Sequence, residues 1–181
     1  GRDRLVNDGR SYVSRVAQLY PSDAPQNFGN GALALRGDVA VVGVPNDSAA
    51  SNGKVYVFER DASGWSETAI LQLDVPTPNF RFGATVDING AGDVIVVGHG
   101  PSVVSGQAVY VYTRNLASTS DAQWTLAQTL TDDTANDFGF SVAIDKADDT
   151  IVVGAKKAVL DSVSGVGAAF VFARNSSNWT Q

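Results

Sequence analysis

Residues 136–155, "NDFGFSVAIDKADDTIVVGA", contain the pattern that decides the fold of this chain. A Phe-Gly pair is followed by alternating apolar residues, a polar turn and a Val-Val-Gly sequence. The same order occurs at 80–100, "FRFGATVDINGAGDVIVVGHG", and at 26–45, "QNFGNGALALRGDVAVVGVP". A pattern that recurs three times in constant order predicts an internal structural repeat.

Four landmarks return at intervals of about 55 residues and fix the length of the repeat. They are Phe28, Phe82 and Phe138; Gly43, Gly98 and Gly154; the aromatic segments 54–58, 108–112 and 168–172; and Trp65, Trp124 and Trp179. We therefore divide the chain into an N-terminal segment, 1–25, and three units, 26–74, 75–131 and 132–181.

Each unit is predicted to form four short β-strands. The first, such as "ATVDI" (84–88), alternates in the way of a strand with two different faces. The second, such as "VIVVG" (94–98), is a continuous β-branched run that favours burial on both faces. The third is aromatic, and the fourth begins at the Trp. Turn residues separate them and helical periodicity is lacking, so the chain is predicted to be all-β.

Four-stranded units that repeat along a chain are typical of β-propeller blades. We predict a β-propeller segment of about three four-stranded antiparallel blades, with a β-trefoil as the alternative. The aromatic of each Phe-Gly pair could wedge between neighbouring sheets. Gly43, Gly98 and Gly154 would end the second strand where only a small residue fits against the next blade.

Three blades do not close a ring, because propellers contain about four to eight. The stretch "VAQLYPSDAPQNFG" (16–29) aligns without a gap on "LAQTLTDDTANDFG" (126–139). Segment 1–25 is therefore predicted to carry the fourth, outer strand of a blade. Either this strand completes the last blade, as in a two-chain, six-bladed ring, or the chain is a piece of a longer propeller.

The composition narrows the function classes. Hydrophobic residues make up 44% of the chain and charged residues 18%, which favours a folded core. The net charge of −6, with scattered Lys and Arg, argues against nucleic acid and anionic membranes as partners. Lack of Cys excludes disulfides, a thiolate nucleophile and a Cys-type metal site. Lack of Met and of a signal-peptide core predicts a processed chain or a fragment.

The motifs resemble the FG-GAP repeat, found in integrin α-subunit propellers and in many secreted microbial and algal proteins. The resemblance covers 26–181 and rests on Phe-Gly, Val-Val-Gly and a strand such as 53–58, "GKVYVF". It implies an extracellular or cell-surface module for adhesion, recognition or structural assembly, without catalysis. The alternative is a propeller enzyme, a polysaccharide hydrolase or lyase with its site at the channel mouth. Three sequons, beginning at Asn46, Asn175 and Asn178, are glycosylation candidates and add to the extracellular expectation.

Many FG-GAP repeats carry a calcium loop between the first two strands. Asp87, Asn89 and Asp93 are the weak calcium candidate here, because the loop is short and Ala91 stands at a ligand position. We therefore expect a polar hairpin turn and no cofactor. The sequence Arg36-Gly37-Asp38, an adhesion signal that integrins recognise, is likewise interpreted as turn chemistry.

The loops after the second strands are predicted to share one face, which resembles the ligand-binding surface of integrin propellers. Varied loops on a rigid scaffold are common binding sites. We expect a protein or glycan partner, or further blades of the same or another chain, with no nucleic acid and no membrane insertion. The candidate residues are Asn46, Asp47, His99, Lys156, Lys157 and Asp161.

Overall fold

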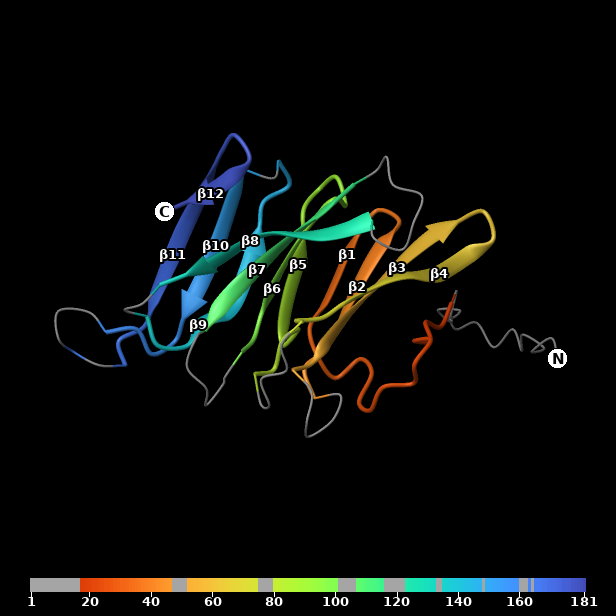
Figure 1. The fold of residues 1–181 in the computed structure, drawn as a ribbon, viewed down its shortest axis with the longest axis horizontal. Coiled ribbons are helices and arrows are strands. Elements are labelled where there is room, and N and C mark those ends of the chain that lie inside the picture. The colour runs from red at the N-terminus through yellow and green to blue at the C-terminus, as the bar shows by residue number, and fades with distance from the viewer. Residues whose placement is uncertain are drawn as a thin grey trace, which may run out of the picture.

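The computed structural model describes residues 17–46, 52–74, 80–100, 107–115, 123–132, 135–147, 149–159, 163 and 165–181. Over these residues the chain is all-β and forms three antiparallel four-stranded sheets. The sheets stand beside one another in chain order, with the first at one end and the third at the other (Figure 1). No helix in this part of the chain is long and apolar enough to cross a membrane.

Sheet 1 contains β1 (Leu33–Arg36), β2 (Val39–Val44), β3 (Lys54–Asp61) and β4 (Gly64–Leu71). Sheet 2 contains β5 (Thr85–Ile88), β6 (Val94–Gly98), β7 (Ala108–Arg114) and β8 (Trp124–Thr131). Sheet 3 contains β9 (Phe138–Ile144), β10 (Thr150–Ala155), β11 (Ala168–Asn175) and β12 (Asn178–Thr180). In every sheet the strands pair in chain order, which confirms the predicted four-stranded units.

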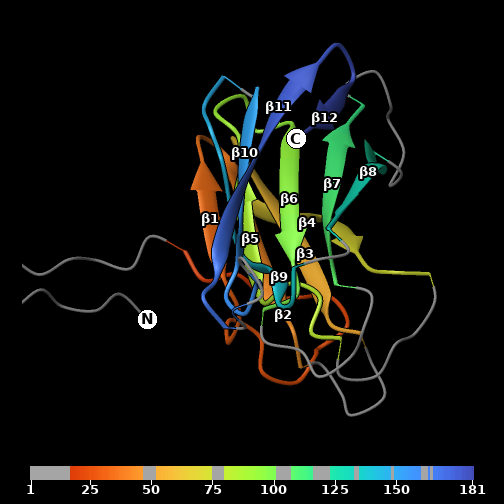
Figure 2. The same cartoon turned by 90° about the vertical axis from the view of Figure 1, so that its left-hand side faces the viewer.

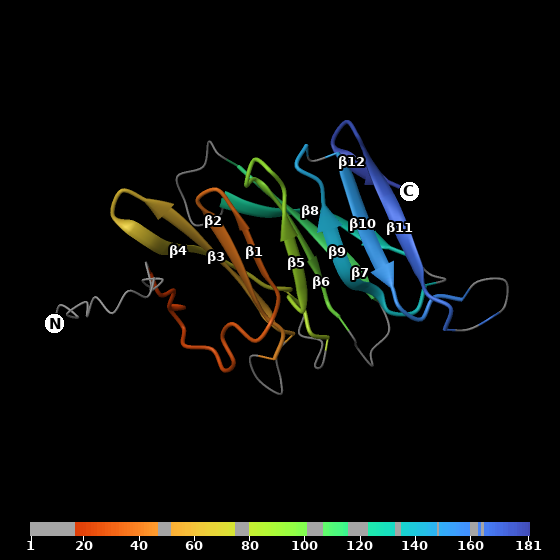
Figure 3. The ribbon, with the colours of Figure 1, turned by 180° about the vertical axis from the view of Figure 1, so that it is seen from behind.

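The second strands form the centre of the core. Every residue of β2 and of β6 is buried, as their continuous β-branched runs predict. One apolar cluster fills the space between sheets 1 and 2, and another fills the space between sheets 2 and 3. The first strands also meet, because β5 contacts both β1 and β9 (Figure 3).

The three Phe-Gly turns have the same conformation. Asn27, Arg81 and Asp137, which precede the Phe, have φ angles of 61°, 62° and 60°. The Phe ring then packs edge-on against two aromatic residues of the third strand in its own unit. Phe82, for example, lies 5.6 Å from Tyr110 and 6.3 Å from Tyr112 between ring centroids. The repeated sequence therefore specifies a repeated turn.

The N-terminal segment differs from its predicted strand. In the single chain, residues 17–25 form no strand. Residues 1–16 lie outside the described residues. Leu19 instead packs on the apolar cluster of sheet 1 that includes Val42 and Tyr56. An edge strand needs a neighbouring strand to pair with, so the fourth strand expected here stays a prediction.

Candidate functional site

The predicted loop face is described only in part, since Asp47 and Asp161 lie outside the described residues. Asn46, Lys156 and Lys157 are exposed. The backbone carbonyl of Asn46 accepts a hydrogen bond from Asn27 at 3.1 Å. Lys157 Nζ lies 3.0 Å from Asp137 Oδ2. These contacts attach both loops to the Phe-Gly turns of their own units, and a binding role for the loops stays a prediction.

His99 corrects one of the predictions, because it is fully buried instead of lying in an exposed loop. It follows Val-Val-Gly and takes the buried position of Val44 and Ala155 in the other units. Its Nε2 lies 2.5 Å from the carbonyl oxygen of Phe138, so Nε2 carries the proton and donates. Desolvation by burial lowers the pKa of His99. Alignment of the three units was the signal that could have placed it inside.

The oxygens of the calcium candidate accept hydrogen bonds from the protein. Asn89 is buried, and its Oδ1 accepts the N–H groups of Asp93 at 3.0 Å and Val94 at 3.1 Å. Asp87 Oδ2 accepts the N–H of Ile144, in sheet 3, at 3.0 Å. Asn89 thus closes a hairpin turn and Asp87 joins two sheets. Within the described ranges no three His, Cys, Asp or Glu residues gather as metal ligands would.

Both charged residues of Arg36-Gly37-Asp38 have partners inside the chain. Arg36 Nη2 lies 3.5 Å from Asp87 Oδ1. Arg60 donates from Nε and Nη2 to Asp38 Oδ1 at 2.7 and 2.5 Å. These contacts hold the tripeptide as the turn between β1 and β2.

The three glycosylation candidates lie at the surface. Asn46 follows β2, whereas Asn175 and Asn178 pair with each other across the turn between β11 and β12. All three residues are exposed. Their side chains are therefore accessible, and glycosylation stays a prediction.

Glycines form the contact between neighbouring sheets. A Cβ on Gly43 would overlap the carbonyl oxygen of Gly83, and a Cβ on Gly98 would overlap that of Gly139. The prediction that Gly43 and Gly98 fit against the next sheet is confirmed. For Gly154, the nearest atoms to such a Cβ belong to Ser141 of the same sheet. The described chain therefore contains two complete glycine contacts and leaves the third glycine of the series at an end.

The outer side of sheet 3 exposes apolar residues that sheets 1 and 2 bury. Val152 in β10 pairs with Val171 in β11, and these residues are 37% and 55% exposed. The equivalent pairs, Val41 with Val57 and Val96 with Val111, are all 0% exposed. We call the surface around Val152 and Val171 the sheet 3 end face; Figure 2 looks onto this end of the molecule.

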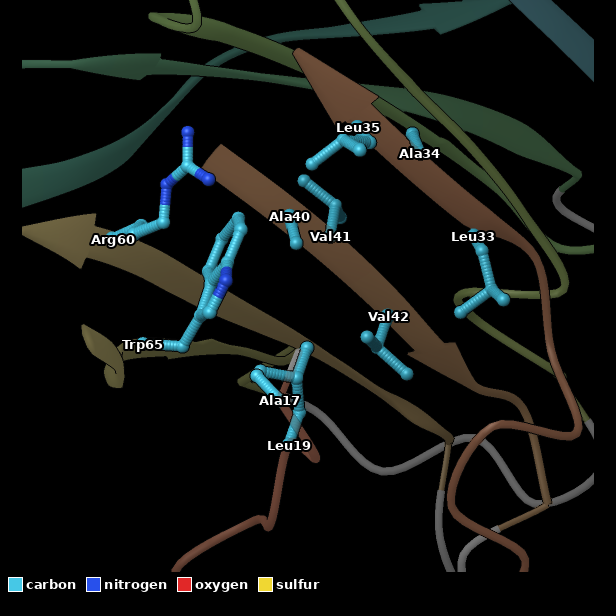
Figure 4. Close-up of a pocket in the computed structure, with 10 residues that line it drawn as sticks. All are labelled: Ala17, Leu19, Leu33, Ala34, Leu35, Ala40, Val41, Val42, Arg60 and Trp65. Atoms are coloured by element: carbon cyan, nitrogen blue, oxygen red, sulfur yellow. The ribbon is translucent and has the colours of Figure 1, made fainter. Parts of the chain in front are cut away.

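On the outer side of sheet 1 the residues of β1 are exposed, whereas Val42 and Tyr56 on the same side are buried in the cluster with Leu19. Leu33 and Leu35 are 67% and 55% exposed, whereas their equivalents Val86 and Ile88 in sheet 2 are 7% and 0% exposed. We call the surface around Leu33 and Leu35 the sheet 1 end face. A groove of about 530 Å³ lies over it, with Leu19 and Trp65 at its border (Figure 4).

The two end faces are the strongest candidate site in the described part of the chain. No role was predicted from the sequence for these exposed residues, Leu33, Leu35, Val152 and Val171. The signal was present, because the repeat aligns each of them with residues that a neighbouring sheet would cover. Comparison of the chain with models of known protein families gives no match, and comparison with curated proteins gives none either.

Proposed function

We propose that the chain is an FG-GAP-type β-propeller module for extracellular adhesion, recognition or structural assembly, without catalysis. The exposure of Val152 and Val171 carries this proposal, because their equivalents are fully buried between sheets. In repeat proteins each unit buries its faces against its neighbours. An exposed apolar face on such a unit marks a surface that binds a further sheet.

The pairing of the strands supports blades rather than a β-trefoil. Each unit forms its own sheet with strands in chain order. The first strands of the three sheets lie next to one another. This is the arrangement of blades that present their first strands to a common axis.

The surface of the module supports a partner outside the chain. The exposed residues Asn46, Asn175 and Asn178 would carry glycans in an extracellular protein. Lys156, an exposed residue in the loop after β10, lines a hollow next to the sheet 3 end face. A protein partner that covers the end face would also meet this loop.

The proposal is tested by adding one more unit. Trp179 is equivalent to Trp124, so repeating residues 127–181 after Gln181 continues the fourth strand of sheet 3 in register. If the sheet 3 end face binds a sheet, the added unit should dock there. At protein concentrations at which the unextended chain is a monomer, the midpoint of thermal unfolding should then rise by about 3 °C or more, since 1 kcal/mol corresponds to roughly 2–4 °C in a chain of this size.

The control is the same extended chain with Val152→Asp and Val171→Asp. Both residues are exposed in the chain as it stands, so the changes should leave its own fold intact. Buried carboxylates would prevent docking, and the gain in the midpoint should disappear. An extended chain that melts at the same temperature as the original would contradict the proposal.

A further inference from the structure

We propose that the partner of the sheet 3 end face is a second copy of this chain. Its Phe28-Gly29 turn and its sheet 1 end face dock there head to tail, and two chains close a ring of six sheets. The inference rests on the proposed function, because it names the partner of the same face. Six sheets fall within the number found in propellers, about four to eight.

The joint between sheets 1 and 2 shows what such docking requires. The Phe-Gly turn of one unit lies against the Val-Val-Gly of the preceding unit and the start of its third strand. The N–H of Phe82 donates to the carbonyl of Asn52 at 2.6 Å. The carbonyls of Phe82 and Gly83 leave no space for a Cβ on Gly53 or Gly43.

The joint between sheets 2 and 3 repeats the glycine contact, and a side-chain oxygen takes the part of the backbone carbonyl as acceptor. The N–H of Phe138 donates to Gln107 Oε1 at 3.1 Å, just before β7 begins. The carbonyl of Gly139 again lies against a Val-Val-Gly glycine, Gly98. In each joint, we call the Val-Val-Gly and the start of the third strand the receiving half. We call the Phe-Gly turn of the next unit the inserting half.

Sheet 3 carries a receiving half. A hollow of about 330 Å³ is lined by Ser141, Gly154, Gly167 and Ala168. Gly154 ends the Val-Val-Gly as Gly43 does, and Gly167 precedes the third strand as Gly53 does. The hollow thus stands where the other two sheets hold a Phe-Gly turn.

Sheet 1 carries the inserting half. Gly29 has a φ of +81°, close to the +86° of Gly83 and the +88° of Gly139. A Cβ on Gly29 would meet no described atom within 4 Å, whereas its two equivalents contact the preceding sheet. Phe28 is half-buried, although Phe82 and Phe138 are 0% exposed. The Phe28-Gly29 turn therefore has the backbone conformation of the two docked turns, although no described sheet lies against it.

The apolar faces next to these halves match as well. In the joint between sheets 2 and 3, Ile144 and Val142 pack in one cluster with Val96 and Val111. Leu33 and Leu35 are the equivalents of Val142 and Ile144. Val152 and Val171 are the equivalents of Val96 and Val111. The same packing between two copies covers every exposed side chain of both end faces named above.

A polar contact of the internal joint is also available between copies. In sheet 2 the hydroxyl of Thr85 accepts the N–H of Val142, in sheet 3, at 3.3 Å. Ser141 pairs with Gly154 as Thr85 pairs with Gly98, so its hydroxyl takes the place of the Thr85 hydroxyl in sheet 3. The N–H of Leu33 is the equivalent donor on the second copy.

Residues 17–20 have a place in the assembled ring. Ala17 and Leu19 border the groove on sheet 1, so this segment must move when a sheet docks there. It aligns on residues 127–130 of β8. Among the described residues, β12 pairs with β11 only through Ala173, Arg174 and Asn175. The remaining outer edge of β11 can accept the displaced segment of the second copy as a fourth strand.

The first test is the mass of the unmodified chain in solution, measured by sedimentation over a range of protein concentrations. We expect a species of twice the 18.9 kDa chain mass that dissociates on dilution. A monomer at every concentration overturns the inference. A series of larger polymers overturns the closed ring, since a head-to-tail contact that does not close gives filaments.

The second test uses two variants that are each damaged on one face. One carries Leu33→Lys and Leu35→Lys, and the other carries Val152→Glu and Val171→Glu. Each alone should be a monomer with an unchanged circular dichroism spectrum. Mixing them should restore the dimer, because one joint then has two unmodified faces and the other joins opposite charges. Failure of the mixture to form a dimer overturns the head-to-tail geometry.

Leu126→Lys is the matched control, since Leu126 is an exposed leucine, 48%, in β8 of the middle sheet. This variant should remain a dimer; a monomer would overturn the assignment of the contact to the end faces. The added-unit experiment separates this inference from the proposed function. If the added unit docks but the unmodified chain stays monomeric, the second copy is overturned as partner while the sheet-binding face stands.

Discussion

Gly43 in β2 and Gly83, in the turn before β5, approach so closely that a Cβ on Gly43 would overlap the Gly83 carbonyl oxygen. The same relationship joins Gly98 in sheet 2 to Gly139 in sheet 3. A backbone carbonyl cannot move aside as a flexible side chain can. A side chain at either position must therefore separate the sheets, so these glycines set the spacing of the stack.

We expect Gly43→Ala to lower the free energy of unfolding by about 1–3 kcal/mol, because the added methyl group overpacks the joint. Gly37→Ala is the control. Gly37 has a φ of +55° and no atom within 4 Å of its Cβ position. Gly37→Ala should therefore lose only the free energy of placing a non-glycine residue in the left-handed conformation, about 1–2 kcal/mol. Urea unfolding of the two variants measures the two losses of free energy of unfolding that are compared. A Gly43→Ala loss well below that of Gly37→Ala would contradict the close approach.

Asp87 offers a test of how sheets 2 and 3 are joined. Asp87→Ala leaves the N–H of Ile144 without its acceptor, and we expect a loss of about 1–3 kcal/mol in the free energy of unfolding. Asp87→Asn keeps an oxygen at the same place and should lose less. Chemical unfolding of the two variants checks this order. Equal losses would assign the contribution to the ion pair with Arg36 instead.

The strands and the glycine joints were predictable because both depend on short-range pattern. Alternation, β-branched runs and turn residues located all four strands of each unit. Gly98 could be assigned to a sheet contact from sequence because its position recurs together with Phe-Gly. Because the same local pattern occurs in three units, each unit supports the interpretation of the others. The observed pairing of β5 with β6 agrees with this pattern.

The end faces and His99 were not predicted, because their environment depends on which sheet lies next to them. His99 looks like a loop residue in sequence, since it follows a strand and precedes Gly100 and Pro101. Its burial comes from the Phe138 turn of another unit, 39 residues away. Leu33 is the opposite case, because it is exposed where its equivalents are buried. Its unit is like the others, but no described sheet covers it.

Added calcium should leave the thermal stability of the chain unchanged. A ligand that binds only the folded state raises the unfolding midpoint. The oxygens of Asn89 and Asp87 already accept protein N–H groups, so calcium would have to displace these bonds. Melting curves in calcium and in a chelator check this. A midpoint that rises with calcium, and no longer does so in Asp93→Ala, would establish a site instead.

His99 predicts a pH dependence with a definite sign. Burial lowers the pKa of His99 below its ordinary value of 6.5, and backbone hydrogen bonds and Asp137 oppose this effect without cancelling it. As the pH falls below about 6.5, the unfolded chain takes up a proton that the folded chain does not. The stability is therefore complete above this pH and falls as the pH is lowered, by at most about 1.4 kcal/mol per pH unit.

Replacing His99 by Val, the residue at the equivalent position 44, should remove this dependence. Urea unfolding at about pH 7.5 and about pH 5.5 measures it, because carboxylates titrate mainly below this window. We expect the unmodified chain to lose more free energy of unfolding between the two pH values than His99→Val does. The comparison of slopes holds even if the variant is less stable overall. Equal slopes would mean that His99 takes up its proton as readily in the folded chain as in the unfolded one, which its burial beneath the Phe138 turn should prevent.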